Sequence, residues 1–250
     1  MKQDWTSYFL RGDEHPVSVF VNLGLREDIP IASNPWRLGV QVFLQNPRPD
    51  GLTNSEEAPT LFLIEDALNH QITRECGAIT PGRITTRGTR QFWYYAKTKE
   101  NFRTAVDIAM KGFPRYRFQV AEKQDPEWEY YLQALYPSRE ELERIKNRDL
   151  LEVLTEQGDT LTLPREVQHW IYFPSEESRT LFGHEASNVG FKIGHECQSD
   201  VQGDWAFGLT VFRTQPIEQE RIDETVLELL RLAERFGGEY DGWESPVTIE

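Results

Sequence analysis

The sequence predicts an α+β fold in two domains, residues 1–137 and 138–250. Short stretches in which every second residue is apolar indicate strands, and between them apolar residues recur at helical spacing. The charge balance also changes sharply near the middle of the chain. With 250 residues, of which 38% are apolar, the chain has enough material for two small cores.

The first half predicts strands and helices in irregular alternation, without an internal repeat. Pro59 marks the start of one helix, because a proline without an N–H group is tolerated in the first turn. Turn-forming residues at Arg87-Gly88 split a long apolar stretch into two strands. The expected elements, in order, are strands at 17–21 and 38–44, a helix at 59–72, strands within 78–97, a helix at 102–110, a strand at 116–120 and a helix at 128–135.

The second half predicts two helices followed by a β-α-β-β-α-β order. Ser138 and Glu141 form a capping box at the start of the first helix, and Asn147 is suited to cap the second. The remaining elements are expected at 166–173, 175–187, 189–197, 204–212, 216–236 and 239–240. This order is typical of a ferredoxin-like antiparallel α/β sandwich, with one sheet and its helices on one face.

Side-chain alternation divides each strand of this predicted sheet into two faces. One face is expected to build the core with Val167, His169, Ile171 and Phe173, then Phe191, Ile193, His195 and Cys197, then Trp205, Phe207, Leu209 and Val211. The opposite face carries Trp170, Tyr172 and Phe212 among polar residues. Three aromatic residues on an uncovered face indicate a docking surface, for either a partner protein or the first domain of this chain.

Nearly all of the excess negative charge lies in the second half. Residues 1–137 hold 16 basic and 17 acidic residues, whereas residues 138–250 hold 11 basic and 24 acidic residues. A field of that sign repels nucleic acid and attracts basic surfaces. It therefore favours a protein partner with a basic surface, and we expect no direct binding to nucleic acid and no contact with a membrane.

The sequence contains no recognisable catalytic motif, so we predict no enzymatic activity, no catalytic residues and no cofactor. A metal site formed by His169, His195 and Cys197 is conceivable, but three ordinary core residues explain the same pattern more simply. If the chain were an enzyme, the first domain around Glu65, Arg83 and Trp128 is where we would expect its site.

Basic and aromatic residues gather around the hairpin predicted within residues 78–97. Phe92-Trp93-Tyr94-Tyr95 lies among six cations, namely Arg83, Arg87, Arg90, Lys97, Lys99 and Arg103. Such a mixture occurs in proteins that bind nucleic acid. It is also typical of a solvated hairpin with one buried aromatic face, which is the interpretation that we favour.

The second half resembles the RraB family, bacterial regulators of ribonuclease E activity. The similarity lies in Gln157-Gly158-Asp159, in the run 164–173, in Gly190-Phe191, in Trp205 and in the closing run 237–244. The first half looks like a bacterial domain of unknown function that often precedes RraB-like domains. Its matching segments are 63–68, 90–95, 125–131 and 135–138.

This resemblance implies a non-catalytic inhibitor that binds ribonuclease E or a related RNA-processing enzyme. An acidic domain that meets a basic scaffold is physically reasonable. The expected contact residues are Trp170, Tyr172, Glu239, Asp241, Trp243 and Glu244. An inhibitor of a basic nuclease, of the immunity or antitoxin kind, fits the same acidity and stays as an alternative.

The expected compartment is the cytoplasm. The first ten residues lack the apolar segment of a signal peptide, and only two cysteines, Cys76 and Cys197, are present.

Overall fold

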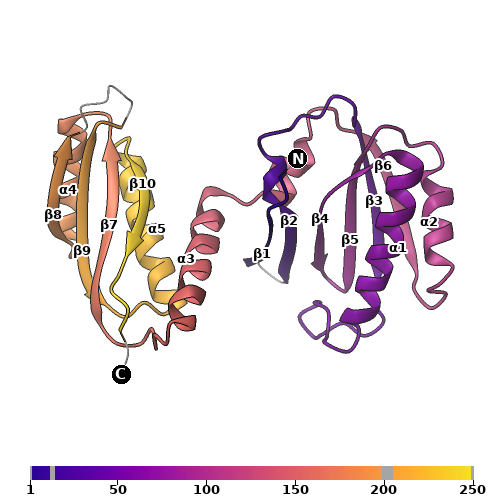
Figure 1. The fold of residues 1–250 in the computed structure, drawn as a ribbon, viewed down its shortest axis with the longest axis horizontal. Helices are drawn as coiled ribbons and strands as arrows, with labels where there is room; N and C mark the ends of the chain where they lie inside the picture. The colour runs from indigo at the N-terminus through magenta and orange to yellow at the C-terminus, as the bar shows by residue number, and fades with distance from the viewer. Residues whose placement is uncertain (1, 12–14, 199–204, 249–250) are drawn as a thin grey trace. The chain divides into compact units, whose positions relative to one another are not determined.

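The computed structural model describes residues 2–11, 15–198 and 205–248. The chain divides into two compact units, Met1–Ser138 (unit 1) and Arg139–Glu250 (unit 2). Each unit combines helices with one antiparallel sheet, which confirms the predicted α+β class (Figure 1).

Unit 1 is built on a six-stranded sheet in the order β1-β2-β4-β5-β3-β6. Its strands are β1 (Trp5–Arg11), β2 (Pro16–Asn22), β3 (Trp36–Phe43), β4 (Ile79–Thr86), β5 (Thr89–Ala96) and β6 (Phe118–Gln124). Its helical elements are η1 (Leu23–Leu25), α1 (Ala58–Cys76), α2 (Phe102–Met110) and the π-helical turn η2 (Tyr131–Leu135). The helix predicted over 128–135 is present at 129–135, where two α-helical residues lead into the π-helical turn. Strand β1 has no counterpart among the predicted strands.

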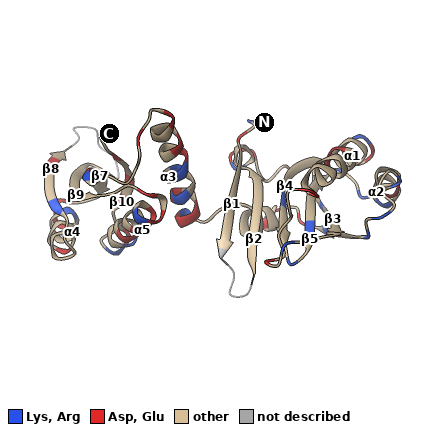
Figure 2. Cartoon of the chain, turned by 90° about the horizontal axis from the view of Figure 1, so that it is seen from below, with Lys and Arg blue, Asp and Glu red and all other residues tan. Residues whose placement is uncertain are grey.

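The core of unit 1 lies between the sheet and helices α1 and α2, which cover the same face (Figure 2). Helix α1 contributes Leu61, Ile64, Leu68 and Ile72, which recur at helical spacing and are all buried. Buried residues of β3 and β5 meet them from the sheet. The opposite face of the sheet is covered in part by residues 128–135, where Trp128 stacks on Tyr95.

Unit 2 is built on a four-stranded sheet in the order β10-β7-β9-β8, with every neighbouring pair antiparallel. Its strands are β7 (Arg165–Phe173), β8 (Lys192–Gln198), β9 (Phe207–Gln215) and β10 (Glu239–Glu244). Its helices are α3 (Arg139–Glu156), α4 (Glu176–Asn188) and α5 (Gln219–Arg235). Helices α4 and α5 lie on one face of this sheet (Figure 2).

Helix α3 is continuous, so the prediction of two helices separated by a cap at Asn147 was wrong. Asn147 lies in the middle of α3 and is buried. Its side chain donates to Asp223 Oδ1 on α5 at 2.8 Å and accepts from Trp243 Nε1 at 2.8 Å. Because both of its polar groups have partners, Asn147 has no need to cap a helix end.

The predicted faces of the sheet hold for β7 but fail for β8. Val167, His169, Ile171 and Phe173 are fully buried under the helices, as predicted. In β8, a bulge between Ile193 and Glu196 shifts the alternation by one residue. Glu196 therefore points to the helix side, where it pairs with Arg179 at 2.7 Å, while Cys197 is exposed opposite Gly208.

Three further residues expected in the core of unit 2 are solvent-exposed. Ile193 is 39% exposed on the edge strand β8, His195 of the same strand is also exposed, and Trp205, which precedes β9, is 44% exposed. Among the described residues, no helix is both long enough and apolar enough to cross a bilayer.

Candidate protein-binding surface

The sheet of unit 2 has one face that helices α4 and α5 leave uncovered, and we call it the open face. It is defined by Gln168, Trp170 and Tyr172 on β7 and by Thr210 and Phe212 on β9. The three aromatic side chains are half-buried. This combination of apolar area with accessible polar groups is common in protein-binding surfaces.

Glycines lie opposite the two aromatic residues of β7 on this face. Trp170 pairs across the sheet with Gly242 on one side and Thr210 on the other, and Tyr172 pairs with Gly208. A Cβ atom on Gly208 would lie 2.4 Å from Cys197 Sγ and 3.1 Å from Tyr172 Cε1. The glycine therefore lets the Cys197 thiol and the Tyr172 ring lie side by side on the open face.

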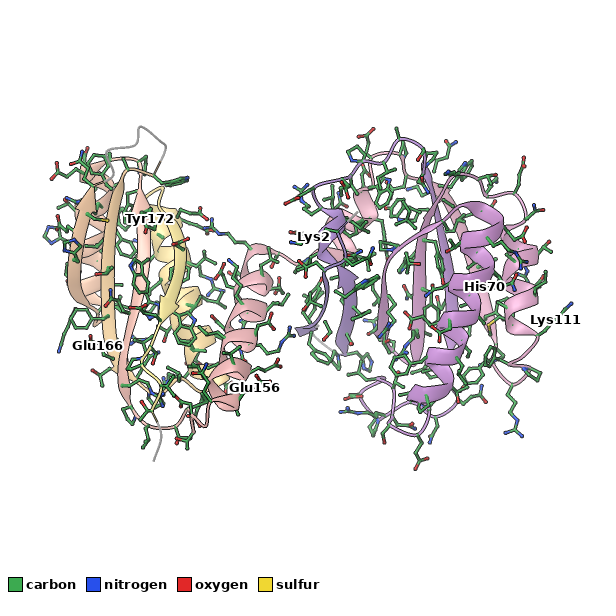
Figure 3. All side chains as sticks on the ribbon, in the orientation of Figure 1. Lys2, His70, Lys111, Glu156, Glu166 and Tyr172 are labelled. Atoms are coloured by element: carbon green, nitrogen blue, oxygen red, sulfur yellow. The ribbon has the colours of Figure 1, made fainter. Side chains whose placement is uncertain are left out.

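Carboxylates border the open face. Glu166 begins the β7 row that continues through Trp170 to Tyr172, and Glu244 pairs with Gln168. Figure 3 labels Glu166 and Tyr172 near the two ends of β7. Asp241 occupies the bulge in β10 and is exposed, and after burial its charge is the main reason why the pKa of Tyr172 is raised. None of these three carboxylates forms an ion pair with a described residue.

The structure separates the six predicted contact residues into two groups. Trp170, Tyr172, Asp241 and Glu244 lie on or beside the open face. Trp243 instead pairs with buried His169 and points into the helix layer, where it bonds to Asn147. The carboxylate of Glu239 turns to Arg139 of α3, with 2.8 Å between Oε1 and Nη2.

Sequence reasoning noted Phe212 but did not include it among the contact residues, and it overlooked Glu166. Phe212 pairs with Gln168 on β7 and with Lys192 on β8, so its ring lies beside the Trp170 and Tyr172 row. Alternate residues of a strand share one face, so Glu166 could have been placed in the same row as Gln168, Trp170 and Tyr172 from the sequence alone.

Most motif residues that carry the family resemblance hold unit 2 together. Asp159 binds Arg165 in a fully buried ion pair, and it also accepts from the backbone N–H groups of Leu161 and Thr248. Burial alone would raise the pKa of Asp159, but these hydrogen bonds outweigh it and lower the pKa to about 2. Asp159 thus fixes the loop before β7 to the start of that strand through the ion pair, and to the segment after β10 through the hydrogen bond from Thr248.

The closing run of the chain is anchored in the same way. His169 Nδ1 and the Tyr240 hydroxyl share a buried hydrogen bond of 2.9 Å. A Cβ atom on Gly238 would lie 2.3 Å from Phe173 Cε1, so only glycine fits there. These contacts join β10 to β7 and to the core.

The residues considered for other chemistry are not assembled into a site. No three His, Cys, Asp or Glu side chains of the described residues gather as metal ligands would. In unit 1, Arg83 Nη1 lies 2.6 and 2.8 Å from the two carboxylate oxygens of Glu65. Trp128 does not lie near this pair. Tyr94 faces α1 and bonds to Asn69, so the adjacent Tyr95 points to the opposite face of the sheet, and Trp128 stacks on it there.

Comparison with known proteins gives two family matches. Residues 3–136 match the model of a family of unknown function, DUF695, and residues 144–245 match the model of Regulator of ribonuclease activity B. Both matches confirm the resemblance seen in the sequence.

The relatives agree with the second match. Proteins named Regulator of ribonuclease activity B from Escherichia coli (strain K12) and Salmonella typhi are 27% identical to this chain over 108 residues. The match covers 43% of this chain and 78% of each relative. A crystal structure of an unknown protein from Galdieria sulphuraria covers 86% of this chain at 14% identity, but its TM-score of 0.24 supports no inference.

Proposed function

We propose that this chain, which belongs over its first half to the DUF695 family of unknown function, regulates a ribonuclease by binding it through unit 2. The match of residues 144–245 to Regulator of ribonuclease activity B carries this proposal. The target is ribonuclease E or a related RNA-processing enzyme with a basic surface. The regulator acts by inhibition and contributes no catalytic group.

The fold of unit 2 supports this assignment. Its β-α-β-β-α-β order, with the strands arranged β10-β7-β9-β8 and the helices on one face, is that expected of a ferredoxin-like sandwich. Fold alone does not determine function, so the argument depends on the charge and shape of the surface.

Ion pairing within unit 2 leaves its surplus carboxylates free for a partner. Nine of its 11 cations pair with carboxylates of the same unit, and Lys192 and Arg235 form no ion pair with a described residue. Exposed carboxylates that have no ion pair within the described part of the chain, such as Glu166, Asp241 and Glu244, then attract a basic surface and accelerate association.

The proposed contact surface is the open face together with this acidic border. Trp170, Tyr172 and Phe212 supply the apolar area that is desolvated on binding, and Glu166, Asp241 and Glu244 supply the charge. Glu239 and Trp243 act indirectly, because they fix β10 against α3.

The test is calorimetric titration of the full chain with purified ribonuclease E at low and high salt. We expect binding that weakens as salt is added, and Trp170→Ala to weaken it about tenfold or more. Glu244→Gln should reduce the salt dependence. Glu152→Gln is the matched control, because Glu152 is exposed on α3 and has no ion pair with any described residue.

Two results would contradict the proposal in different ways. Absence of binding at low salt would overturn ribonuclease E as the target. Binding that is unchanged in both Trp170→Ala and Glu244→Gln would overturn the open face as the contact surface.

A further inference from the structure

The sheet of unit 1 also has a surface that no helix of that unit covers. On the side opposite α1 and α2, residues 128–135 cover the region near β2 and β4, and Trp128 and Tyr130 also pack on Tyr95 and Trp93 of β5. The other end of β5 and the neighbouring parts of β3 and β6 remain accessible on this side. Here Gln91, Gln41 and Gln119 form one row across β5, β3 and β6. We call this surface the glutamine face, and it also includes Trp93 and Gly39 of the neighbouring row.

The glutamine face presents polar groups without partners. The three glutamine amides form no side-chain hydrogen bond with any described residue. The indole Nε1 of Trp93 is buried and likewise lacks a partner. These residues line a hollow of about 110 Å³ together with Gly39 and Ala121. Donors and acceptors that are left free beside a hollow indicate a ligand with hydrogen-bonding edges.

The Trp93 ring forms one wall of this hollow, and further flat groups lie beside it. A Cβ atom on Gly39 would lie 2.5 Å from the Trp93 ring, so the glycine allows the indole to lie against the sheet. The ring centroids of Trp93 and Tyr130 are 4.4 Å apart, and Arg37 Cζ lies 4.3 Å from the Tyr130 centroid. Flat groups of this kind stack with nucleobases.

Three cations lie on or beside this face. Arg37, Lys123 and Arg117 lie on the same side as the glutamine row, and none forms an ion pair with a described carboxylate. Arg117 directly precedes β6 and lies six residues before Lys123, which corresponds to about 20 Å of extended chain. Arg37 and Lys123 also line an adjoining hollow that contains Asp125, Glu127 and Glu129, but none of these carboxylates lies within ion-pair distance of either cation.

From these observations we infer that the glutamine face of unit 1 binds single-stranded nucleic acid. A base would occupy the hollow beside Trp93, where the glutamine amides meet its hydrogen-bonding edge. The flanking phosphates would contact Lys123 and Arg117. This reverses the expectation, drawn from the acidity of the whole chain, that nucleic acid is not bound directly. It is independent of the partner proposed for unit 2.

The experiment measures fluorescence anisotropy of labelled 12-nucleotide oligo(A), as RNA and as DNA, with the full chain at low salt. We expect saturable binding to at least one single strand and weaker binding to duplex RNA. Because each phosphate contact contributes a slope of about −0.7 in a plot of log affinity against log salt, the two contacts with Lys123 and Arg117 predict a slope of about −1.4.

Variants test the proposed contacts. Arg117→Gln combined with Lys123→Gln should make the salt slope less steep. Gln119 is exposed and its side chain has no hydrogen bond with a described residue, so Gln119→Ala should raise the Kd severalfold. Glu127→Gln combined with Glu129→Gln should tighten binding. Lys111→Gln is the control, since Lys111 is an exposed cation after α2 (Figure 3) and should have no effect.

Three results would overturn the inference. The first is that neither oligonucleotide binds at low salt. The second is that Lys111→Gln lowers the affinity as much as the Arg117/Lys123 variant does. The third is that a neutral oligosaccharide such as maltohexaose binds in place of the oligonucleotides. The last result would identify the hollow as a carbohydrate site.

Discussion

The hydroxyl of Tyr240 lies 2.9 Å from Nδ1 of His169, and both side chains are buried in the core of unit 2. His169 is on the central strand β7, and Tyr240 is on the edge strand β10, 71 residues later. This hydrogen bond joins two segments on which the family resemblance depends. Both residues therefore report on the integrity of the sheet.

The His169 pair predicts a loss of stability in mild acid. Burial, followed by the charge of Arg213, lowers the pKa of His169 to about 3, from an ordinary value near 6.5. Below pH 6.5, His169 is therefore protonated in the unfolded chain but stays neutral in the folded chain down to about pH 3. The free energy of unfolding consequently falls as the pH falls. Between pH 7 and pH 5 the expected loss from this residue is about 2 kcal/mol. Urea unfolding of the wild type and of His169→Gln at both pH values measures it, and the variant should show a smaller change.

Breaking the buried ion pair of unit 2 should be strongly destabilising. Asp159→Asn leaves the guanidinium of Arg165 buried without a counter-ion, which costs about 3–5 kcal/mol. Glu224→Gln removes a partner of Arg221 from an exposed pair, and we expect an effect below about 1 kcal/mol. Denaturant unfolding compares the two variants. Equal effects would show that the buried pair has no special role.

The two adjacent glycines before β10 should respond differently to substitution. Gly237 has φ of +67° and open space around it, so Gly237→Asn should be tolerated. Gly238 lies against the Phe173 ring, and Gly238→Ala should cost about 1–3 kcal/mol through overpacking. Thermal unfolding of the two variants ranks them, and the opposite ranking would contradict this assignment.

The thiol of Cys197 offers a probe of the open face. Cys197 is exposed beside Tyr172, whereas Cys76 is buried and burial raises the pKa of its thiol. A bulky maleimide should therefore label Cys197 first and block binding of the proposed ribonuclease partner. Cys197→Ser should bind normally and resist this inactivation. Full binding by the labelled wild type would exclude the region around Tyr172 from the contact.

The hydrogen bond between Tyr95 and Asp125 should stabilise unit 1. The Tyr95 hydroxyl donates to Asp125 Oδ2 at 2.5 Å, and Asp125 also accepts from the backbone N–H groups of Glu129 and Tyr130. Tyr95→Phe removes a hydrogen bond to a charged group and should cost about 1.5–3 kcal/mol. Tyr136→Phe is the comparison in the same unfolding assay, because Tyr136 is a half-buried residue of the same unit whose hydroxyl has no hydrogen bond with a described residue.

Alternation predicted the fold well where strands are regular. In β7 the apolar and polar residues alternate without interruption, so both the buried and the open faces followed from the sequence. In β8 the extra residue between Ile193 and Glu196 has no sequence signal apart from Gly194, whose missing Cβ would lie 2.4 Å from Thr210 Oγ1. A bulge is defined by how a strand pairs with its neighbour, so it cannot be predicted from the sequence of one strand alone.

The candidate sites were predictable to different degrees. Trp170 and Tyr172 followed from strand parity, but Trp243 did not, because the β10 bulge at Asp241 turns its indole toward Asn147. The glutamine face was not predicted at all. Gln41, Gln91 and Gln119 are far apart in sequence, and only the strand order β5-β3-β6 brings them into one row.

The position of β10 at the outer edge of the unit 2 sheet has a consequence for synthesis on the ribosome. All strands and helices of unit 1 precede residue 136, so they are synthesised first. In unit 2, β7 can pair on one side only after its partner strand β10, which ends at Glu244, has been synthesised. At 5–20 residues per second, unit 1 has roughly 5–20 s to fold before that strand is made. During this interval the emerging second unit exposes an unpaired β7 edge, and it is the stage at which a chaperone or a premature stop codon would matter most.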